Sequence, residues 1–595
     1  HWIKTTGELL DIDSDEISTA VKKALSAQKR FVDDCYAAGE KIIKQLADQN
    51  RRGVVLLGRP YNTSDQFSNL HLARKLQSLG IVPLPYDFIS PSEEPLPQLW
   101  VRIRWGYGRS LVQAARSMKK YSNIGAVVVT NFGCGPDAFV DQYLEYELND
   151  IPHIVLEFDE HQGEAGLLTR LEAFARVFIQ RKKEAAVISG KDPGKPRIPL
   201  QDYTYYIPSF MDHAYAFTGA LQASGCCTVL LPPTDGESMR IGEQYCYGKE
   251  CHPFISYTGD LLKAARQPGF VAEKACYYGP SYLGPCLLPQ YCLGLHLILE
   301  RAGLGDVTVM NIADETNMSE LGPLYIMRLV FGMYTIDRFF RWKTEVEPYE
   351  RNRGEIDSVY RAVLQKLEKG LASGSLVKFF QAIREGVKLL KKVPLRAGER
   401  NRPAVGVVGD VYTRVNAYSN NRLYERLQEY GFEVWASSTV IDISFLALEQ
   451  RHAEYERQGK GVLSSLARLA LPGSRFVKWL VDRHFPDSLR NPTEGDYHAV
   501  VKNTDKYTDF WIDKALSLNI NRVEELNQAE AAGAINVMCH NCMLGTITDA
   551  LSPAMARDKD DFPLATLVYE GLQSTHNTNR IEAFVQQVRS KQAME

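Results

Sequence analysis

Three short stretches of this chain each carry two closely spaced cysteines, whose thiolates act as metal ligands or as nucleophiles. The stretches span residues 245–253, 284–292 and 536–546, and their cysteines are Cys246, Cys251, Cys286, Cys292, Cys539 and Cys542. Each pair adjoins Gly or Pro and precedes an expected helix. We therefore expect the sulfurs to converge on helix N-termini, where free N–H groups and the helix dipole favour the thiolate.

The wide separation of the three loops bears on which metal they would hold. Sites made only of thiolates select zinc or iron–sulfur clusters. A structural zinc site is closed by four ligands, usually from two compact hooks, and three dispersed loops fit that pattern poorly. Clusters do take thiolates from dispersed loops. The residues therefore favour iron–sulfur over zinc, and inert packed thiols are the third alternative.

Most of the other cysteines are assigned to packing. Cys35 lies on an expected helix, and Cys226 and Cys227 precede a strand at the end of its sheet opposite the expected site. Cys276 lies inside an expected strand. It is the reserve ligand if Cys292 proves to be part of the core.

The totals exclude several classes of protein. Eleven cysteines in 595 residues are too sparse for a disulfide scaffold. A net charge of −3 without a long basic run argues against a nucleic-acid partner. The chain has no apolar run of about 18 residues and no signal peptide, so we expect a cytoplasmic protein without a membrane partner. Because the first residue is His rather than Met, we also expect it to be part of a longer polypeptide.

Strands and helices alternate along much of the chain. A buried-strand pattern at residues 53–58 is followed by a helix ending near Gly80 and a second strand at residues 81–84. Further strands are expected at residues 228–231 and 274–278. This alternation predicts parallel sheets, in which ligands bind outside the carboxyl ends of the strands.

One strand–loop–helix unit occurs twice. Residues 54–84 match residues 405–435 at a constant offset of 351, and further on Cys134 of the first copy corresponds to Cys542 of the second. The matched positions, first copy first, include Gly58/Gly409, Tyr61/Tyr412, Ser68/Ser419, Asn69/Asn420, Leu76/Leu427, Gly80/Gly431 and Phe174/Phe584. So many matches in one order predict a duplicated domain.

Together these patterns predict an α/β protein of several Rossmann- or flavodoxin-like lobes with parallel sheets, containing a duplicated domain and a helical segment. A linker rich in Gly, Lys and Pro is expected at residues 189–199. The expected domains are an N-terminal helical segment (1–50), a first-copy lobe with the Cys134 loop (51–188), a lobe with the Cys246/Cys251 and Cys286/Cys292 loops (200–322), a helical segment (323–400), and a second-copy lobe with a helical insertion and the Cys539/Cys542 loop (401–595).

The cysteine motifs resemble those of the 2-hydroxyacyl-CoA dehydratase/benzoyl-CoA reductase family of cluster-binding proteins. They are Cys251-His-Pro-Phe with Gly259-Asp260, Gly284-Pro-Cys286 with Gln290-Tyr291, and Cys542-Met-Leu-Gly-Thr with Arg580-Ile-Glu-Ala-Phe584. The resemblance covers nearly the whole chain and is closest to the C-terminal half of large acyl-CoA dehydratase activase-type proteins. It implies a [4Fe–4S] cluster on Cys251, Cys286 and Cys542. It also implies low-potential reduction by an ASKHA-type ATPase activator that itself carries an iron–sulfur cluster.

This sequence departs from the family pattern through the second cysteine of each loop. Cys246, Cys292 and Cys539 stand where other residues are expected. Six thiolates suit two cubanes with three each, which is similar to the double-cubane proteins, whose [8Fe–9S] cofactor serves ATP-dependent reduction of small molecules. Cys134 has no such partners in the first copy, so either the lobe supplying them precedes His1 or this half is a degenerate structural partner.

The leading hypothesis is an iron–sulfur reductase component of double-cubane type that acts on a small molecule in an anaerobic host. One alternative is a 2-hydroxyacyl-CoA dehydratase-type subunit with one [4Fe–4S] cluster, and another is an electron-transfer or scaffold module without its own substrate. No GxxxxGK[ST] motif occurs, so the ATPase activator is expected as a separate subunit or a fused N-terminal part. The sequence leaves the oligomeric state open, with a homodimer as one alternative. It also identifies no proton donor.

Overall fold

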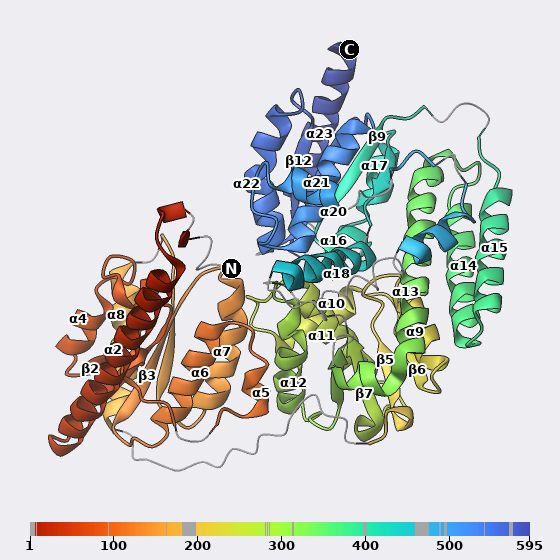
Figure 1. The fold of residues 1–595 in the computed structure, drawn as a ribbon. Helices are drawn as coiled ribbons and strands as arrows, with labels where there is room; N and C mark the ends of the chain where they lie inside the picture. Colours follow the sequence, from red (N-terminus) through yellow and green to blue (C-terminus); the bar gives the residue numbers. More distant parts are fainter. Residues whose placement is uncertain are drawn as a thin grey trace. The chain divides into compact units, whose positions relative to one another are not determined.

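The computed structural model divides the chain into two compact units, His1–Pro193 and Gly194–Glu595. Within them, the described residues are 6–7, 9–92, 95–161, 163–180, 198–279, 281–282, 284, 286–311, 315–396, 401–438, 440–457, 475–486, 489–492, 497–540, 542–570 and 575–594. Most of the expected linker at residues 189–199 lies outside these ranges. Figure 1 shows three sheets, each flanked by helices, which confirms the predicted α/β class.

The first unit contains a parallel four-stranded sheet of order β2-β1-β3-β4. Its strands are β1 (Gly53–Gly58), β2 (Val82–Pro85), β3 (Ile124–Asn131) and β4 (His153–Phe158). Every residue of β1 is buried, as a strand covered on both faces requires. The helices are α2 (Ser14–Asp48), α3 (Pro60–Ser64), α4 (Leu72–Ser78), α5 (Gln98–Val101), α6 (Gly106–Met118), α7 (Gly135–Leu148) and α8 (Glu164–Gln180), with the 3-10 turn η1 (Tyr86–Phe88).

The second unit repeats this sheet near its C-terminal end, in the order β10-β9-β11-β12. The strands are β9 (Ala404–Gly409), β10 (Glu433–Ala436), β11 (Gly533–Cys539) and β12 (Leu564–Tyr569). Helices α17 (Leu423–Glu429) and α23 (Thr575–Met594) pack on one face, and α21 (Lys514–Gln528) packs on the other. The remaining helices of this part are α16 (Val411–Val415), α18 (Val440–Arg457), α20 (Tyr497–Thr504) and α22 (Met543–Arg557).

Strand pairing in the two sheets confirms the duplication. Gly53 pairs with Val82 in the first copy, and Ala404 pairs with Glu433 in the second, so both partners are displaced by 351 residues. The loop after each first strand also enters the left-handed region at matching positions, His71 and Arg422. The two copies therefore share register and turn geometry as well as sequence.

Between the copies, the second unit contains a third parallel sheet of order β6-β5-β7-β8, which we call the middle lobe. Its strands are β5 (Thr204–Ile207), β6 (Cys227–Leu230), β7 (Ala275–Gly279) and β8 (Thr308–Asn311). Its helices are α9 (Ala214–Gln222), α10 (Gly236–Tyr245), α11 (His252–Ala265) and α12 (Tyr291–Arg301), with the short turn η4 (Leu288–Gln290).

The predicted helical segment consists of α13 (Glu315–Val346), α14 (Glu355–Ala372) and α15 (Leu376–Lys392). Part of the insertion at residues 451–490 packs against this helical segment. Val481 and Phe485 are buried in the core formed by these helices, and the Phe485 ring lies 4.8 Å from that of Phe339. Residues 458–474 of the insertion lie outside the described residues.

Candidate metal centre

The second-copy cysteine loop joins a buried strand to a helix, as predicted. Strand β11 ends at Cys539, and Cys542 is the N-cap of α22, with its N–H donating to the Cys539 carbonyl at 3.1 Å. The Asn536 side chain donates to the Gly545 carbonyl at 3.2 Å and so ties the helix to the strand. The two sulfurs are thereby held at the carboxyl end of a central strand, where open α/β sheets bind ligands.

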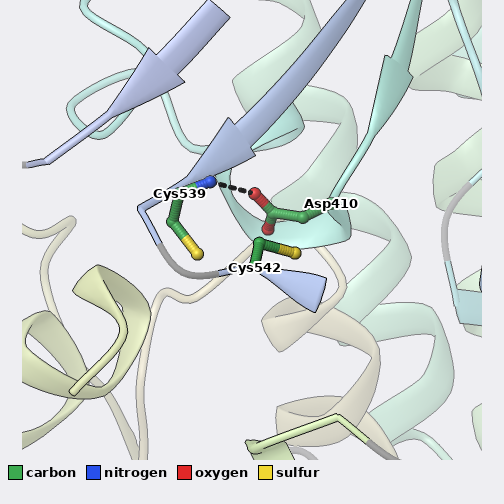
Figure 2. A group of neighbouring side chains, drawn as sticks. All are labelled: Asp410, Cys539 and Cys542. Atoms are coloured by element: carbon green, nitrogen blue, oxygen red, sulfur yellow. Dashed lines mark hydrogen bonds between the residues drawn. The ribbon is translucent and has the colours of Figure 1, made fainter. Parts of the chain in front are cut away.

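A buried carboxylate, Asp410, completes a compact group with these two cysteines. One carboxylate oxygen and the two sulfurs all lie within 4.8 Å of one another, and Figure 2 shows the three side chains turned toward one another. Asp410 caps α16 by accepting the N–H groups of Tyr412 and Thr413 at 3.0 Å each. Its second oxygen accepts the Cys539 N–H at 3.1 Å. Since both oxygens already have backbone donors, Asp410 positions the loop besides offering a ligand atom.

Cys251 reaches the same place from the middle lobe. It is the N-cap of α11 and is buried, and its sulfur lies 2.8 Å from the Tyr291 hydroxyl. Burial, together with the nearby Cys542 and Asp410, raises the pKa of Cys251 to about 12. A thiol in this environment keeps its proton at neutral pH until a metal ion replaces it.

Cys286 approaches from the loop that follows β7. Burial raises the pKa of its thiol well above the ordinary value, and Cys542 and Cys251 lie close enough to raise it further. The Leu288 N–H points at its sulfur at 3.5 Å. In the same loop, the Tyr282 hydroxyl donates to Asp513 at 2.8 Å and fastens the loop to the N-cap of α21. Three loops far apart in the sequence thus bring Cys251 and Cys286 within electrostatic range of Cys542, which lies beside Cys539.

The other two predicted ligands make different contacts. Cys246 does not precede a helix N-terminus but ends α10 as its C-cap, next to Glu250 and Thr258 as well as Cys251. Cys292 lies in the first turn of α12, where the Asn311 side chain donates to its sulfur at 3.7 Å. Cys276, the reserve ligand, is fully buried in β7 beside Cys292. The Cys246/Cys251 pair does precede a helix, α11, as expected, whereas the expectation is corrected for Cys292, which lies inside α12.

The polar neighbours of the ligands have contacts of their own. The Nε2 atom of buried His252 lies 2.7 Å from the Ser419 hydroxyl, and burial lowers the pKa of this histidine to about 4. Glu250 accepts the Tyr247 N–H at 3.1 Å, and burial raises the pKa of its carboxyl group. His540 is exposed and lies 3.5 Å from Glu570. His252 is therefore neutral near pH 7 and serves to join the middle lobe to the second copy.

The first-copy loop holds its cysteine by a different network. Cys134 is the N-cap of α7, as Cys542 is of α22, but the Arg59 guanidinium donates to its sulfur at 3.3 Å. Arg59 also pairs with Asp137 at 3.3 Å, and Tyr107 donates to the same carboxylate at 2.8 Å. Burial and Asp137 raise the pKa of Cys134 to about 12.

The four gathered thiols fit an iron–sulfur cluster by the chemistry of the donor set. They are sulfur donors from separate loops, set in a largely buried site where two of them cap helix N-termini. The Asp410, Cys539 and Cys542 group alone is compact enough for one metal ion such as zinc.

Comparison with known proteins bears on the N-terminal part of the chain. Residues 1–89 match the family model described as CoA enzyme activase uncharacterised domain (DUF2229). This match supports a relation to the CoA enzyme activases, and it ends before the cysteine loops of the second unit. No curated protein matches the chain. Among the described helices, none combines the length and apolar character that crossing a membrane requires.

Sequence reasoning overlooked Asp410, and the internal repeat could have revealed it. Position 410 corresponds to Arg59 at the offset of 351 residues, so the residue after the first strand differs in charge between the copies. A polar residue directly after a buried strand marks a ligand-binding edge in this class of fold. The importance of Tyr282 and Asp513 had no comparable indication, because their contact joins residues 231 positions apart.

Proposed function

We propose that this chain is an iron–sulfur cluster-binding component of a CoA enzyme activase-type system and receives low-potential electrons from an ATP-dependent activator. The observation that carries the proposal is the compact group of Asp410, Cys539 and Cys542, with Cys251 and Cys286 from two other loops within electrostatic range of Cys542. The match of residues 1–89 to a CoA enzyme activase domain supports the kind of system in which it works.

The residues of this chain would bind and insulate the cofactor. Cys251, Cys286 and Cys542 supply thiolates, with Cys539 beside them, and the cluster when bound supplies one-electron chemistry at low potential. The Tyr291 hydroxyl, 2.8 Å from the Cys251 sulfur, can donate to the thiolate and stabilise its negative charge. The Asp410 carboxylate accepts the Cys539 N–H at 3.1 Å, and this hydrogen bond would hold the loop in one conformation during reduction of the cluster.

One cluster on the four gathered thiols is the arrangement that the geometry supports best. It suits the dehydratase-type alternative as well as a single-cluster reductase. A double cubane on six thiolates is the second candidate, and the proximity of Cys246 to Cys251 favours it. In that case the side chains of Cys246 and Cys292 have to turn from Thr258 and Asn311 toward the site.

Anaerobic reconstitution of the full chain followed by iron and sulfide analysis tests the proposal. About four irons with acid-labile sulfide indicate one cubane, and about eight indicate the double cubane. Chemical reduction in the presence of the activator and a small substrate then separates a reductase from an electron-transfer module. Recovery of zinc without sulfide would contradict the proposal.

A further inference from the structure

A small cavity lies in the first unit, which contains none of the paired cysteine loops. It has a volume of about 270 Å³ and lies between α2, the 3-10 turn η1 and α6. This is just below the roughly 300–1,000 Å³ typical of sites for drug-sized ligands. The cavity therefore suits a ligand of only a few heavy atoms.

The cavity belongs to the fold because α2 packs closely on η1. A side chain at Gly39 would place its Cβ atom 1.9 Å from the Phe88 carbonyl oxygen, so only glycine permits this contact. Ile43 and Leu46 are buried on the same helix and hold its C-terminal half against the sheet. The preceding turns of α2 then form one wall of the cavity.

Aromatic rings and a carboxylate line this cavity. Phe31 and Tyr36 face it from α2, and Tyr86 and Asp87 face it from η1. The other lining residues are Gln28, Val32, Cys35, Ile89, Pro91, Ser110, Gln113 and Ala114, so none of the described lining residues carries a positive charge. The described lining thus combines three aromatic side chains with the carboxylate of Asp87, and it includes no cationic residue.

The pKa values of the two cavity tyrosines are raised, partly by the same Asp87 carboxylate. Partial burial and the Asp87 carboxylate raise the pKa of Tyr86 to about 12. Burial, Asp87 and Asp33 raise the pKa of Tyr36 as well. The two phenols therefore stay neutral near pH 7, and the carboxylates of Asp87 and Asp33 supply the negative charge in and beside the cavity.

We propose that this cavity binds a small organic ammonium cation, recognised by the rings of Phe31, Tyr36 and Tyr86 and by the carboxylate of Asp87. Aromatic faces attract ammonium groups through their quadrupole, most strongly where water is partly excluded. A carboxylate beside the rings adds a charge that a neutral ligand of the same shape cannot use. The inference is independent of the proposed cluster, because the first unit contains none of the gathered cysteines.

Calorimetric titration of the full chain with choline tests the inference. The matched probe is 3,3-dimethylbutan-1-ol, which has the same shape without the charge. We expect choline to bind and the alcohol to bind at least about tenfold more weakly, in keeping with a cation–π and carboxylate contribution. Methylammonium is the second probe, and binding of this ion in place of choline supports the proposal and assigns a primary ammonium. Equal binding of choline and the alcohol, or no binding of either cation at millimolar concentration, overturns it.

Variants locate the binding in this cavity. Asp87→Asn and Tyr36→Leu are each expected to weaken choline binding about three- to tenfold, whereas Tyr86→Phe keeps the ring and retains most of it. The matched control is Asp34→Asn, since Asp34 is an exposed acid on the same helix that does not line the cavity. An equal loss in Asp34→Asn and Asp87→Asn shows attraction by the general field of the helix and overturns the assignment.

Discussion

The loops that carry Cys134 and Cys542 stand at the same point of two copies of one fold, yet their surroundings differ. In the first copy, Arg59 and Asp137 form an ion pair of 3.3 Å beside the cysteine. In the second, the position of Arg59 holds Asp410, and Cys539 adds a further thiol. In the first copy, the Arg59 guanidinium next to the sulfur balances the negative charge of Asp137, so no metal is needed for charge balance. A carboxylate among thiols leaves negative charge that a metal would balance.

The two copies also differ in how far the residues after the first strand are covered by other parts of the chain. Tyr61 of the first copy is 55% exposed, whereas its counterpart Tyr412 is 3% exposed. Tyr412 is covered because its hydroxyl lies 2.6 Å from that of Ser256 in the middle lobe. The lobe that buries the second copy also brings Cys251 and Cys286 to it. A metal centre in this fold therefore depends on a covering lobe as much as on the cysteine loop.

The largest expected effect comes from replacing the second-copy cysteine, Cys542, compared with its first-copy counterpart, Cys134. Cys542→Ser should abolish most of the iron and sulfide bound after anaerobic reconstitution, because a serine oxygen is a poor ligand for cluster iron. Cys134→Ser, the matched control in the first copy, should leave the metal content unchanged. The measurement is iron and sulfide per chain, and equal losses in both variants would erase the functional difference between the copies.

Metal removal should destabilise the second unit and leave the stability of the first unit unchanged. A bound cluster stabilises only the unit that holds it, since ligand binding to the native state adds to the free energy of unfolding. Chelation under anaerobic conditions should increase hydrogen exchange of α11 and α22 while leaving α6 and α7 unchanged. Exchange measured by mass spectrometry checks this, and a uniform response of all four helices would speak against a metal confined to the second unit.

Breaking the ion pair of the first copy should weaken its fold. Arg59→Met leaves the buried Asp137 carboxylate without its cation, which should lower the free energy of unfolding of the first unit by about 3 kcal/mol. Arg59→Lys keeps a charge and should cost less. Urea unfolding followed by exchange in α6 and α7 reports the change. A Met variant as stable as the unchanged chain would refute the neutralising role of Arg59.

Acid should strengthen the part of the middle lobe that covers the second copy. Asp260 on α11 is buried and accepts the Thr234 hydroxyl at 2.8 Å, and burial raises its pKa to about 6. Because the folded state holds this proton more tightly than the unfolded state, the free energy of unfolding should rise as the pH falls from about 6 to 4, by at most about 3 kcal/mol. Asp260→Asn should flatten this dependence in urea titrations, and an unchanged slope would count against it.

The smallest expected effect concerns the hydroxyl contact between the middle lobe and the second copy. Tyr412→Phe removes the contact with Ser256 and should lower the free energy of unfolding of the second unit by about 1 kcal/mol. Tyr61→Phe is the matched control, because the Tyr61 side chain is largely exposed and should tolerate the change. Chemical denaturation of both variants checks this, and similar costs would mean that burial does not distinguish these tyrosines.

Much of the scaffold could be predicted from local patterns. The buried run at residues 53–58 and its counterpart near residue 405 are strands because apolar residues fill them without interruption, and both form central strands. The position of Cys542 before a helix followed from the repeat. The orientations of Cys246 and Cys292 could not be predicted, because a shift of one or two residues around a helix turns a side chain to another face.

The sequence by itself determined the α/β class, the duplication and the three loops that carry paired cysteines, since periodicity and repetition are properties of neighbouring residues. Only the tertiary structure decided which thiols meet, that Asp410 stands among them, and that the middle lobe covers one copy. These outcomes depend on contacts between residues far apart in the chain, such as Tyr282 with Asp513, which no local pattern encodes.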